Sequence, residues 1–102
     1  MMIRHMVLLT LRDEFRPDAA EVQAALKASR DMAHQIPEAA TWVVHPGVSE
    51  RKGAADFVGC GDFDDRNAVQ RFLTHPDHIH TASLWDVVSR AVVADIQIRR
   101  DT

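Results

Sequence analysis

The apolar alternation at the start of this 102-residue chain constrains its fold more than any other feature. Residues 2–12 predict a β-strand, because hydrophobic side chains recur there at every second position. One face consists of Ile3, His5, Val7, Leu9 and Leu11. The other face carries Met6 and Leu8 in its middle, and a strand that is apolar on both sides is usually covered on both sides. The fold must therefore supply a layer for each face of this strand.

The next segments alternate between helical and strand periodicity. A helix is predicted over residues 17–36, because apolar side chains follow a helical repeat there and Pro37 ends it. Its stripe consists of Val22, Ala25, Leu26, Ser29, Met32, Ala33 and Ile36. Strands are predicted over residues 40–45 and 56–63, joined by a polar hairpin loop over 48–55. Gly59 and Gly61 in the later strand indicate a bulge or the close approach of another group.

The last third of the chain predicts a broken helix and a final strand. Asp64 and Asp65 offer an N-cap to a helix whose apolar side holds Ala68, Val69, Phe72 and Leu73. Thr74 and Asp77 have the spacing of a capping box, which predicts a second helix running to Val88. In the strand over residues 90–99, one set of side chains is expected to pack on the helices. That set is Val92, Ala94, Ile96 and Ile98.

The order strand, helix, strand, strand, broken helix, strand is that of the ferredoxin-like βαββαβ sandwich, an α+β fold with its helices on one face of an antiparallel sheet. The other sheet face is then bare in a monomer. Depending on register, its exposed side chains are Met6, Leu8, Trp42, Val44 or Val93. We expect a second copy to cover this face by two-fold symmetry, which predicts a homodimer.

Composition excludes several classes of protein. A net charge of −3 does not favour a nucleic-acid partner. No apolar run approaches the roughly 20 residues of a membrane span, and none resembles a secretory peptide, so a single cytoplasmic domain over residues 1–102 is expected. The lone Cys60 excludes an internal disulfide framework and is interpreted as a small buried hydrophobe.

Six histidines and no tyrosine leave proton chemistry near neutral pH to imidazole. His5 lies on the apolar face of the first strand, and His78 shares a helix face with Ala82 and Trp85. Each is either a buried structural side chain or part of one cavity between sheet and helices. A metal site is not expected at His75, His78 and His80, because their side chains diverge around the helix.

Asp95 alternates with the apolar residues of the last strand, and two interpretations are open. It either pairs with an arginine on the face away from the helices, or orients an imidazole as carboxylates do in histidine-based acid–base pairs. The alternation favours the first interpretation, because Asp95 lies opposite the side chains expected to meet the helices.

Several motifs together resemble the stress-responsive A/B barrel (Dabb) family over essentially the whole chain. They are the opening Ile3-Arg-His-Met-Val-Leu-Leu9, the pair Ile36-Pro37, the strand end Asp62-Phe63, the run Phe72-Leu-Thr-His-Pro-Asp-His78 and the closing Val92-Val-Ala-Asp95. The resemblance implies a dimeric α+β barrel built from ferredoxin-like units.

The resemblance also implies a site. One plant member of the family is a cofactor-free polyketide cyclase whose catalytic His matches His78, and a pocket His matches His5. Its catalytic Tyr falls on Phe72, which has no hydroxyl to polarise a carbonyl. The expected apolar pocket is lined by His5, Val7, Leu9, Phe72, His78 and Trp85. It indicates either a cofactor-free cyclase or lyase with His78 as base and His5 as positioning residue, or a non-catalytic stress-associated or small-molecule-binding homodimer.

Overall fold

In the computed structural model, which describes residues 1–100, four antiparallel strands form one sheet. They are β1 (Met2–Leu11), β2 (Val43–Pro46), β3 (Phe57–Phe63) and β4 (Ser89–Ile98), in the spatial order β2-β3-β1-β4. β1 pairs with β3 on one side and with β4 on the other. This topology confirms the predicted ferredoxin-like βαββαβ fold.

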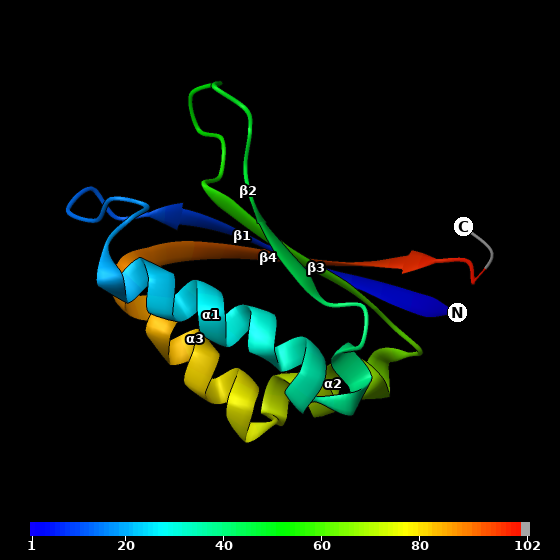
Figure 1. Cartoon of the computed structure of the whole chain (residues 1–102). Helices are drawn as coiled ribbons and strands as arrows, with labels where there is room; N and C mark the ends of the chain where they lie inside the picture. Colours follow the sequence, from blue (N-terminus) through cyan, green and yellow to red (C-terminus); the bar gives the residue numbers. More distant parts are fainter. Residues whose placement is uncertain (101–102) are drawn as a thin grey trace.

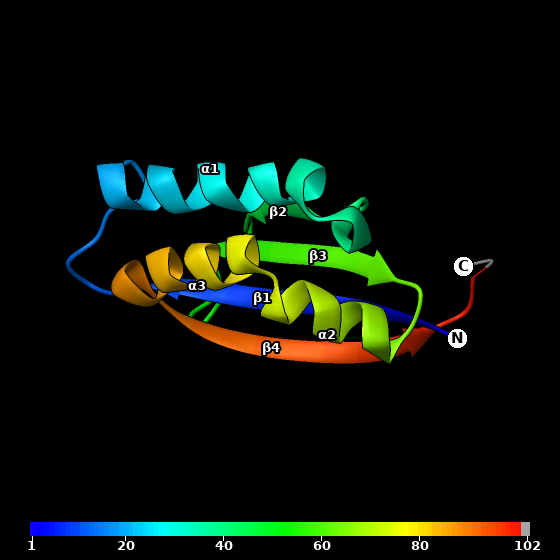
Figure 2. The same cartoon turned by 90° about the horizontal axis from the view of Figure 1, so that it is seen from below.

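All the helices lie on one face of the sheet (Figure 1). They are α1 (Ala20–Gln35), the 3-10 turn η1 (Pro37–Ala39), α2 (Arg66–Thr74) and α3 (Pro76–Val88). Seen from the helix side, α1 lies over the β2 side of the sheet, while β4 runs along the opposite edge beyond the helices (Figure 2). No helix within residues 1–100 is both long and apolar enough to cross a lipid bilayer.

Two predicted boundaries move inward. α1 begins at Ala20, since residues 17–19 form a turn and Ala19 supplies no side-chain cap. β2 begins at Val43, since the residues after η1 continue as a turn through Thr41.

The predicted capping box at the start of α3 is wrong. The N-cap is His75, whose Nδ1 accepts a hydrogen bond from the Asp77 N–H at 3.1 Å. Thr74 is the last residue of α2, and its hydroxyl donates to the Gln70 carbonyl at 2.9 Å. The residue before Pro76 is pushed into an extended conformation, which makes that residue the helix boundary. The predicted cap at Asp65 is confirmed, because its carboxylate accepts from the Ala68 N–H at 2.8 Å.

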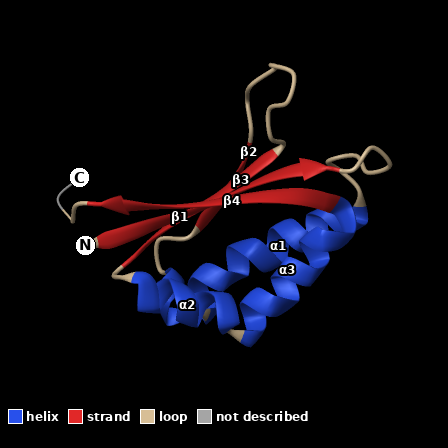
Figure 3. Cartoon of the chain, turned by 180° about the vertical axis from the view of Figure 1, so that it is seen from behind, coloured by secondary structure: helices blue, strands red, loops and turns tan. Residues whose placement is uncertain are grey.

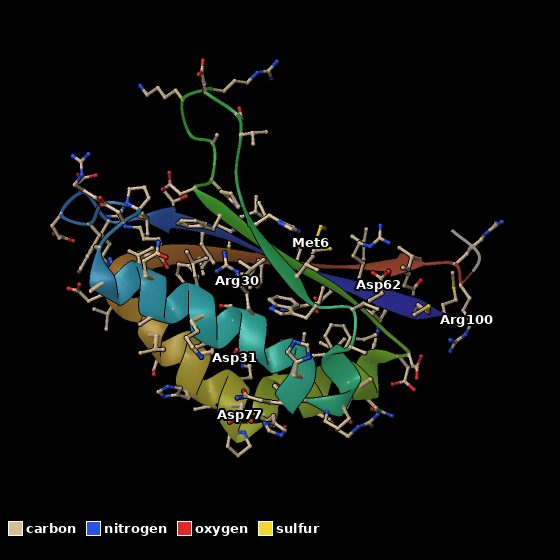
Figure 4. All side chains as sticks on the ribbon, viewed as in Figure 1. Met6, Arg30, Asp31, Asp62, Asp77 and Arg100 are labelled. Atoms are coloured by element: carbon tan, nitrogen blue, oxygen red, sulfur yellow. The ribbon has the colours of Figure 1, made fainter. Side chains whose placement is uncertain are left out.

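The sheet buries one face against the helices and leaves the other open. Ile3, His5 and Leu9 of β1 are buried on the helix side, as predicted. Trp42 and Val44 also lie there and are buried, so the prediction that they line the bare face is wrong. The apolar side chains of the open sheet face include Met6, Leu8, Val43, Val58, Cys60, Val92, Ala94 and Ile96, and Arg4, His45 and Asp62 also lie on it. Figure 4 shows Met6 pointing away from the helices.

The predicted orientation of β4 is also wrong. Val93 lies opposite Val7 and Asp95 opposite His5, so both face the helix side of the sheet. The alternation misleads because β4 is an edge strand beyond the helix layer, where neither face is buried. Val92 and Val93, on opposite faces, are 67% and 64% exposed. Hydrophobicity therefore carried no information about which face turns inward.

Gly59 and Gly61 accommodate the indole of Trp42. A Cβ atom at Gly59 would lie 2.6 Å from Trp42 Cζ2, and one at Gly61 would lie 3.0 Å from Trp42 Cε3. The predicted close approach is confirmed. The alternative of a bulge is wrong, because β3 keeps an unbroken register with β1 from Phe57 to Phe63.

We expect Gly59→Ala to lower the free energy of unfolding by about 1–3 kcal/mol, because its methyl group overpacks the contacts with Trp42 and, at 2.9 Å, with Val7 Cγ1. Gly61→Ala, with a looser contact, should lower it less. Urea unfolding would measure both. In a Trp42→Leu background the effect of Gly59→Ala should shrink. Equal stability of Gly59→Ala and the wild type would contradict the close contact.

Candidate functional site

A cavity of about 240 Å³ lies between the sheet and the helices. Its wall is mostly apolar and is made by β1, β2 with the preceding Trp42, β4, α1, α3 and the end of α2. The lining residues are His5, Val7, Leu9, Ser29, Met32, Trp42, Val44, Leu73, His78, Thr81, Ala82, Trp85, Asp86, Ala91, Val93 and Asp95. Five of the six side chains expected to line one pocket therefore come together here.

The sixth, Phe72, does not line the cavity. Its side chain is fully buried in the core beside the wall. Its ring centroid lies 5.9 Å from that of His5 and 4.6 Å from that of His78. Phe72 therefore packs against both imidazoles and holds their rings in place.

His5 is buried on β1 and paired with Asp95 on β4. The His5 Nδ1 and Asp95 Oδ1 atoms are 2.5 Å apart, and the two residues are direct neighbours in the strand register. A carboxylate only accepts, so Nδ1–H donates and the second ring nitrogen, Nε2, is left for the cavity. The expectation that Asp95 pairs with an arginine on the other face is wrong, and the alternative, in which it orients an imidazole, matches this geometry.

His78 projects into the cavity from α3. Its Nδ1–H donates to the Leu73 carbonyl at 3.1 Å, which leaves Nε2 as the basic nitrogen of the neutral ring. Burial lowers the pKa of His78, the nearby His5 lowers it further, and the Leu73 carbonyl opposes the shift. A neutral ring with a free Nε2 at physiological pH is the form that a general base requires.

Two buried hydroxyls and the indole N–H groups of two tryptophans also belong to the polar part of the wall, together with Asp86. Ser29 Oγ accepts from Trp85 Nε1 at 2.7 Å, and Thr81 donates to the Asp77 carbonyl at 2.8 Å. The indole N–H of Trp42 has no hydrogen-bond partner within residues 1–100. Sequence reasoning missed Ser29 as a site residue, although it is the one polar side chain in the predicted apolar stripe of α1 and that signal was available.

The other residues considered for chemistry lie elsewhere. His75 caps α3 and His80 is exposed. Within residues 1–100, no group of three or more His, Cys, Asp or Glu side chains is arranged to hold a metal ion. Cys60 is half-buried on the open sheet face, and burial raises the pKa of its thiol.

Comparison with known proteins finds a matching family model and a relative of similar length. The family model described as stress responsive A/B barrel domain matches residues 3–98. An uncharacterised protein of Streptomyces coelicolor is 35% identical over 96 residues, an alignment covering 94% of this chain and 99% of that protein.

Solved structures share the whole fold. A dimeric ferredoxin-like protein of unknown function from Thermobifida fusca has a TM-score of 0.82 at 23% identity, covering 96% of this chain and 92% of that one. A hydroxynitrile lyase from Passiflora edulis has a TM-score of 0.82 at 13% identity, covering 97% and 94%. A cofactor-independent oxygenase from Streptomyces nogalater has a TM-score of 0.71 at 16% identity, also covering 97% and 94%. At these identities the likeness establishes the fold alone.

The lowered pKa of His78 predicts a pH dependence of stability. The folded protein binds a proton there less readily than the unfolded chain, whose His pKa is near 6.5. The free energy of unfolding should therefore fall as the pH drops below 6.5 and level off below the folded pKa. Histidine NMR titration, with the His78 signal assigned by its loss in His78→Gln, measures the folded value. A midpoint at or above 6.5 would refute the burial of a neutral ring.

Proposed function

Because the chain belongs to the stress-responsive A/B barrel domain family, we propose that it uses the fold for cofactor-free acid–base catalysis of the cyclase or lyase type on a small carbonyl compound. One observation carries the proposal. His5 and His78 line the same apolar cavity, each with its Nδ1 fixed by a partner on the protein and its Nε2 left over.

In the proposed reaction, His78 acts as general base. Its Nε2 takes a proton from the carbon next to the substrate carbonyl; the C–H bond breaks and its electron pair moves onto the carbonyl oxygen as an enolate. The enolate carbon then attacks a second carbonyl group of the substrate: a C–C bond forms, the C=O π bond breaks, and the resulting alkoxide takes the proton back from His78 Nε2. In the lyase direction the same steps run in reverse: His78 Nε2 takes the hydroxyl proton, the C–C bond breaks and a carbonyl compound leaves. Asp95 fixes the orientation of the His5 ring, which positions the substrate against the base.

The size of the cavity supports a small ligand. A dry apolar cavity of roughly 150 Å³ accommodates benzene. The cavity here is about 240 Å³, which suits a substituted aromatic ring or a compound of similar bulk. One fold neighbour is named a hydroxynitrile lyase and another a cofactor-independent oxygenase, which supports the use of this fold for enzyme reactions, in the second case without a cofactor.

The alternative function is that of a non-catalytic small-molecule-binding homodimer. The observation that favours it is Phe72, which brings no hydroxyl to the imidazoles and is fully buried. In that case His78 closes one side of a binding pocket and moves no proton.

Proton exchange separates the two functions without knowledge of the natural substrate. We expect the protein to accelerate hydrogen–deuterium exchange at the methyl group of acetophenone in D₂O, followed by ¹H NMR. His78→Gln should lower this rate by about 10²-fold or more, because a positioned base contributes at least that much. Asp95→Asn should lower it as well, because the His5 ring loses its fixed orientation.

The matched control for that experiment is His80→Gln, because His80 is an exposed histidine on the same helix. This variant should catalyse the exchange of acetophenone at the wild-type rate. A wild type that binds acetophenone but exchanges no faster than buffer would favour the binding function. Unchanged exchange in His78→Gln would reject His78 as the base.

We also propose that the open sheet face is the surface of a homodimer. Leu8, Val92 and Ile96 are exposed on it, while Arg4 and Asp62 at its end neutralise each other through a two-point contact at 2.8 and 3.0 Å. The loop over residues 47–56 rises on this same side of the sheet, away from the helices (Figure 3), and its Val48 is 94% exposed. A second copy facing the sheet would cover these apolar side chains, and several fold neighbours are described as dimeric.

Sedimentation at micromolar concentration tests the dimer. We expect a wild-type dimer and a shift to monomer in Val92→Asp, because a charge is unfavourable in an apolar interface. Ile79→Asp is the matched control, since Ile79 is similarly exposed, at 58%, but lies on α3 in the helix layer. A monomeric wild type, or equal dissociation of both variants, would contradict the proposed surface.

A further inference from the structure

The hydroxyl of Ser29 has an unused hydrogen-bond donor in the wall of the cavity. Ser29 is only 2% exposed, and it lines the cavity from α1. Its one hydrogen bond within residues 1–100 is the 2.7 Å contact with Trp85 Nε1. An indole N–H only donates, so Ser29 Oγ accepts in that contact and its own proton has no acceptor.

Other hydroxyls in the same region behave differently. Thr81 donates to the Asp77 carbonyl and Ser89 to the Trp85 carbonyl, each four residues earlier and each at 2.8 Å. Such back-bonding is the usual use of a hydroxyl on a helix, and Ser29 does not make it. A buried donor without an acceptor is unfavourable, so an oxygen atom presented by a ligand at this point would gain the hydrogen bond that the protein does not supply.

The bond from Trp85 prepares Ser29 for this use. The hydrogen bond occupies one lone pair of the Ser29 oxygen and polarises its O–H group. This polarisation strengthens a hydrogen bond that the O–H group donates to a ligand. Trp42 also carries an unpartnered N–H, but its ring is held against Gly59 and Gly61 and stacked on His5, so its donor points in one fixed direction. The Ser29 hydroxyl can rotate its proton toward a ligand.

We infer that Ser29 is the donor that binds the carbonyl oxygen of the ligand in this cavity, an assignment that rests on the proposed function for the class of compound. The oxygen end of the ligand then faces α1. The carbon next to it faces the Nε2 atoms of His5 and His78 on β1 and α3. Ser29 is thus a specificity-determining residue for ketones and aldehydes with an apolar body.

Two probes of nearly the same shape test the assignment. Acetophenone has a C=O group where α-methylstyrene has C=CH₂, so the ratio of their dissociation constants reports the hydrogen bond. We expect the wild type to bind acetophenone about tenfold more tightly, the size of one good hydrogen bond. Calorimetric or NMR titration gives both constants.

The informative variants are Trp85→Phe and the double variant Trp85→Phe/Ser29→Ala. The double variant removes both members of the Ser29–Trp85 bond, so no buried indole N–H is left unpaired and the fold is preserved. Trp85→Phe should keep the preference for acetophenone, whereas the double variant should bind the two probes equally. If Ser29 only holds Trp85 in place, the two variants will show the same preference.

Three further outcomes separate this inference from the proposed function. Loss of the preference in Trp42→Phe, with the preference kept in the double variant, would assign the donor to Trp42 and overturn the inference. Equal binding of acetophenone and α-methylstyrene by the wild type would also overturn the role of Ser29. In that case the proposal that His78 is the general base would still stand if His78→Gln lost the hydrogen–deuterium exchange activity. Failure of the wild type to bind either probe would overturn both the ligand class and the role of Ser29.

Discussion

The structure depends on a mismatch of widths: the sheet is one strand wider than the helix layer that covers it. The helices bury the inner faces of β2, β3 and β1, and β4 remains along the edge (Figure 2). The uncovered part of β4 therefore leaves space beside α3, and the cavity occupies that space with Ala91, Val93 and Asp95 in its wall.

This mismatch also decides the electrostatics of the cavity. His5 lies on β1, under the helices, and is buried, whereas its partner Asp95 on β4 keeps a side chain that is half exposed. The carboxylate can thus stay hydrated while it fixes a buried imidazole, which avoids the desolvation of a fully buried charge. Within residues 1–100 the hydrogen-bond partner of the His78 ring is the Leu73 carbonyl, whose effect is smaller than that of burial, so the pKa of His78 is lowered. The two rings share a cavity in different electrostatic settings.

The same geometry explains how much of the molecule was predictable. His5, Val7 and Leu9 follow from the alternation of β1, because that strand is covered and its pattern reports burial. The inward face of α3 was predictable for the same reason. The sheet face on which Asp95 lies was not predictable. Both faces of the edge strand β4 are exposed, so the order of its apolar and polar residues does not show which face turns toward the helices. Phe72 was expected in the wall of the cavity but lies in the core beside it. Its position in the helical repeat shows that its side chain turns inward, but not whether it meets the cavity or the packed core.

Three polar groups of this cavity distinguish it from a packing defect, because each makes one hydrogen bond to the described part of the protein and keeps a further hydrogen-bonding atom without a partner there. Among the described residues, His5 and His78 each use Nδ1 on the protein and leave Nε2 without a partner, while Ser29 uses a lone pair and keeps a proton. A core that needed only stability would favour apolar side chains at these positions, because each polar group loses its hydration on burial. Within residues 1–100, two Nε2 atoms, the Ser29 hydroxyl proton and the Trp42 indole N–H therefore remain without a partner in a mostly apolar wall. That set is complementary to a molecule with one carbonyl oxygen and an acidic C–H beside it.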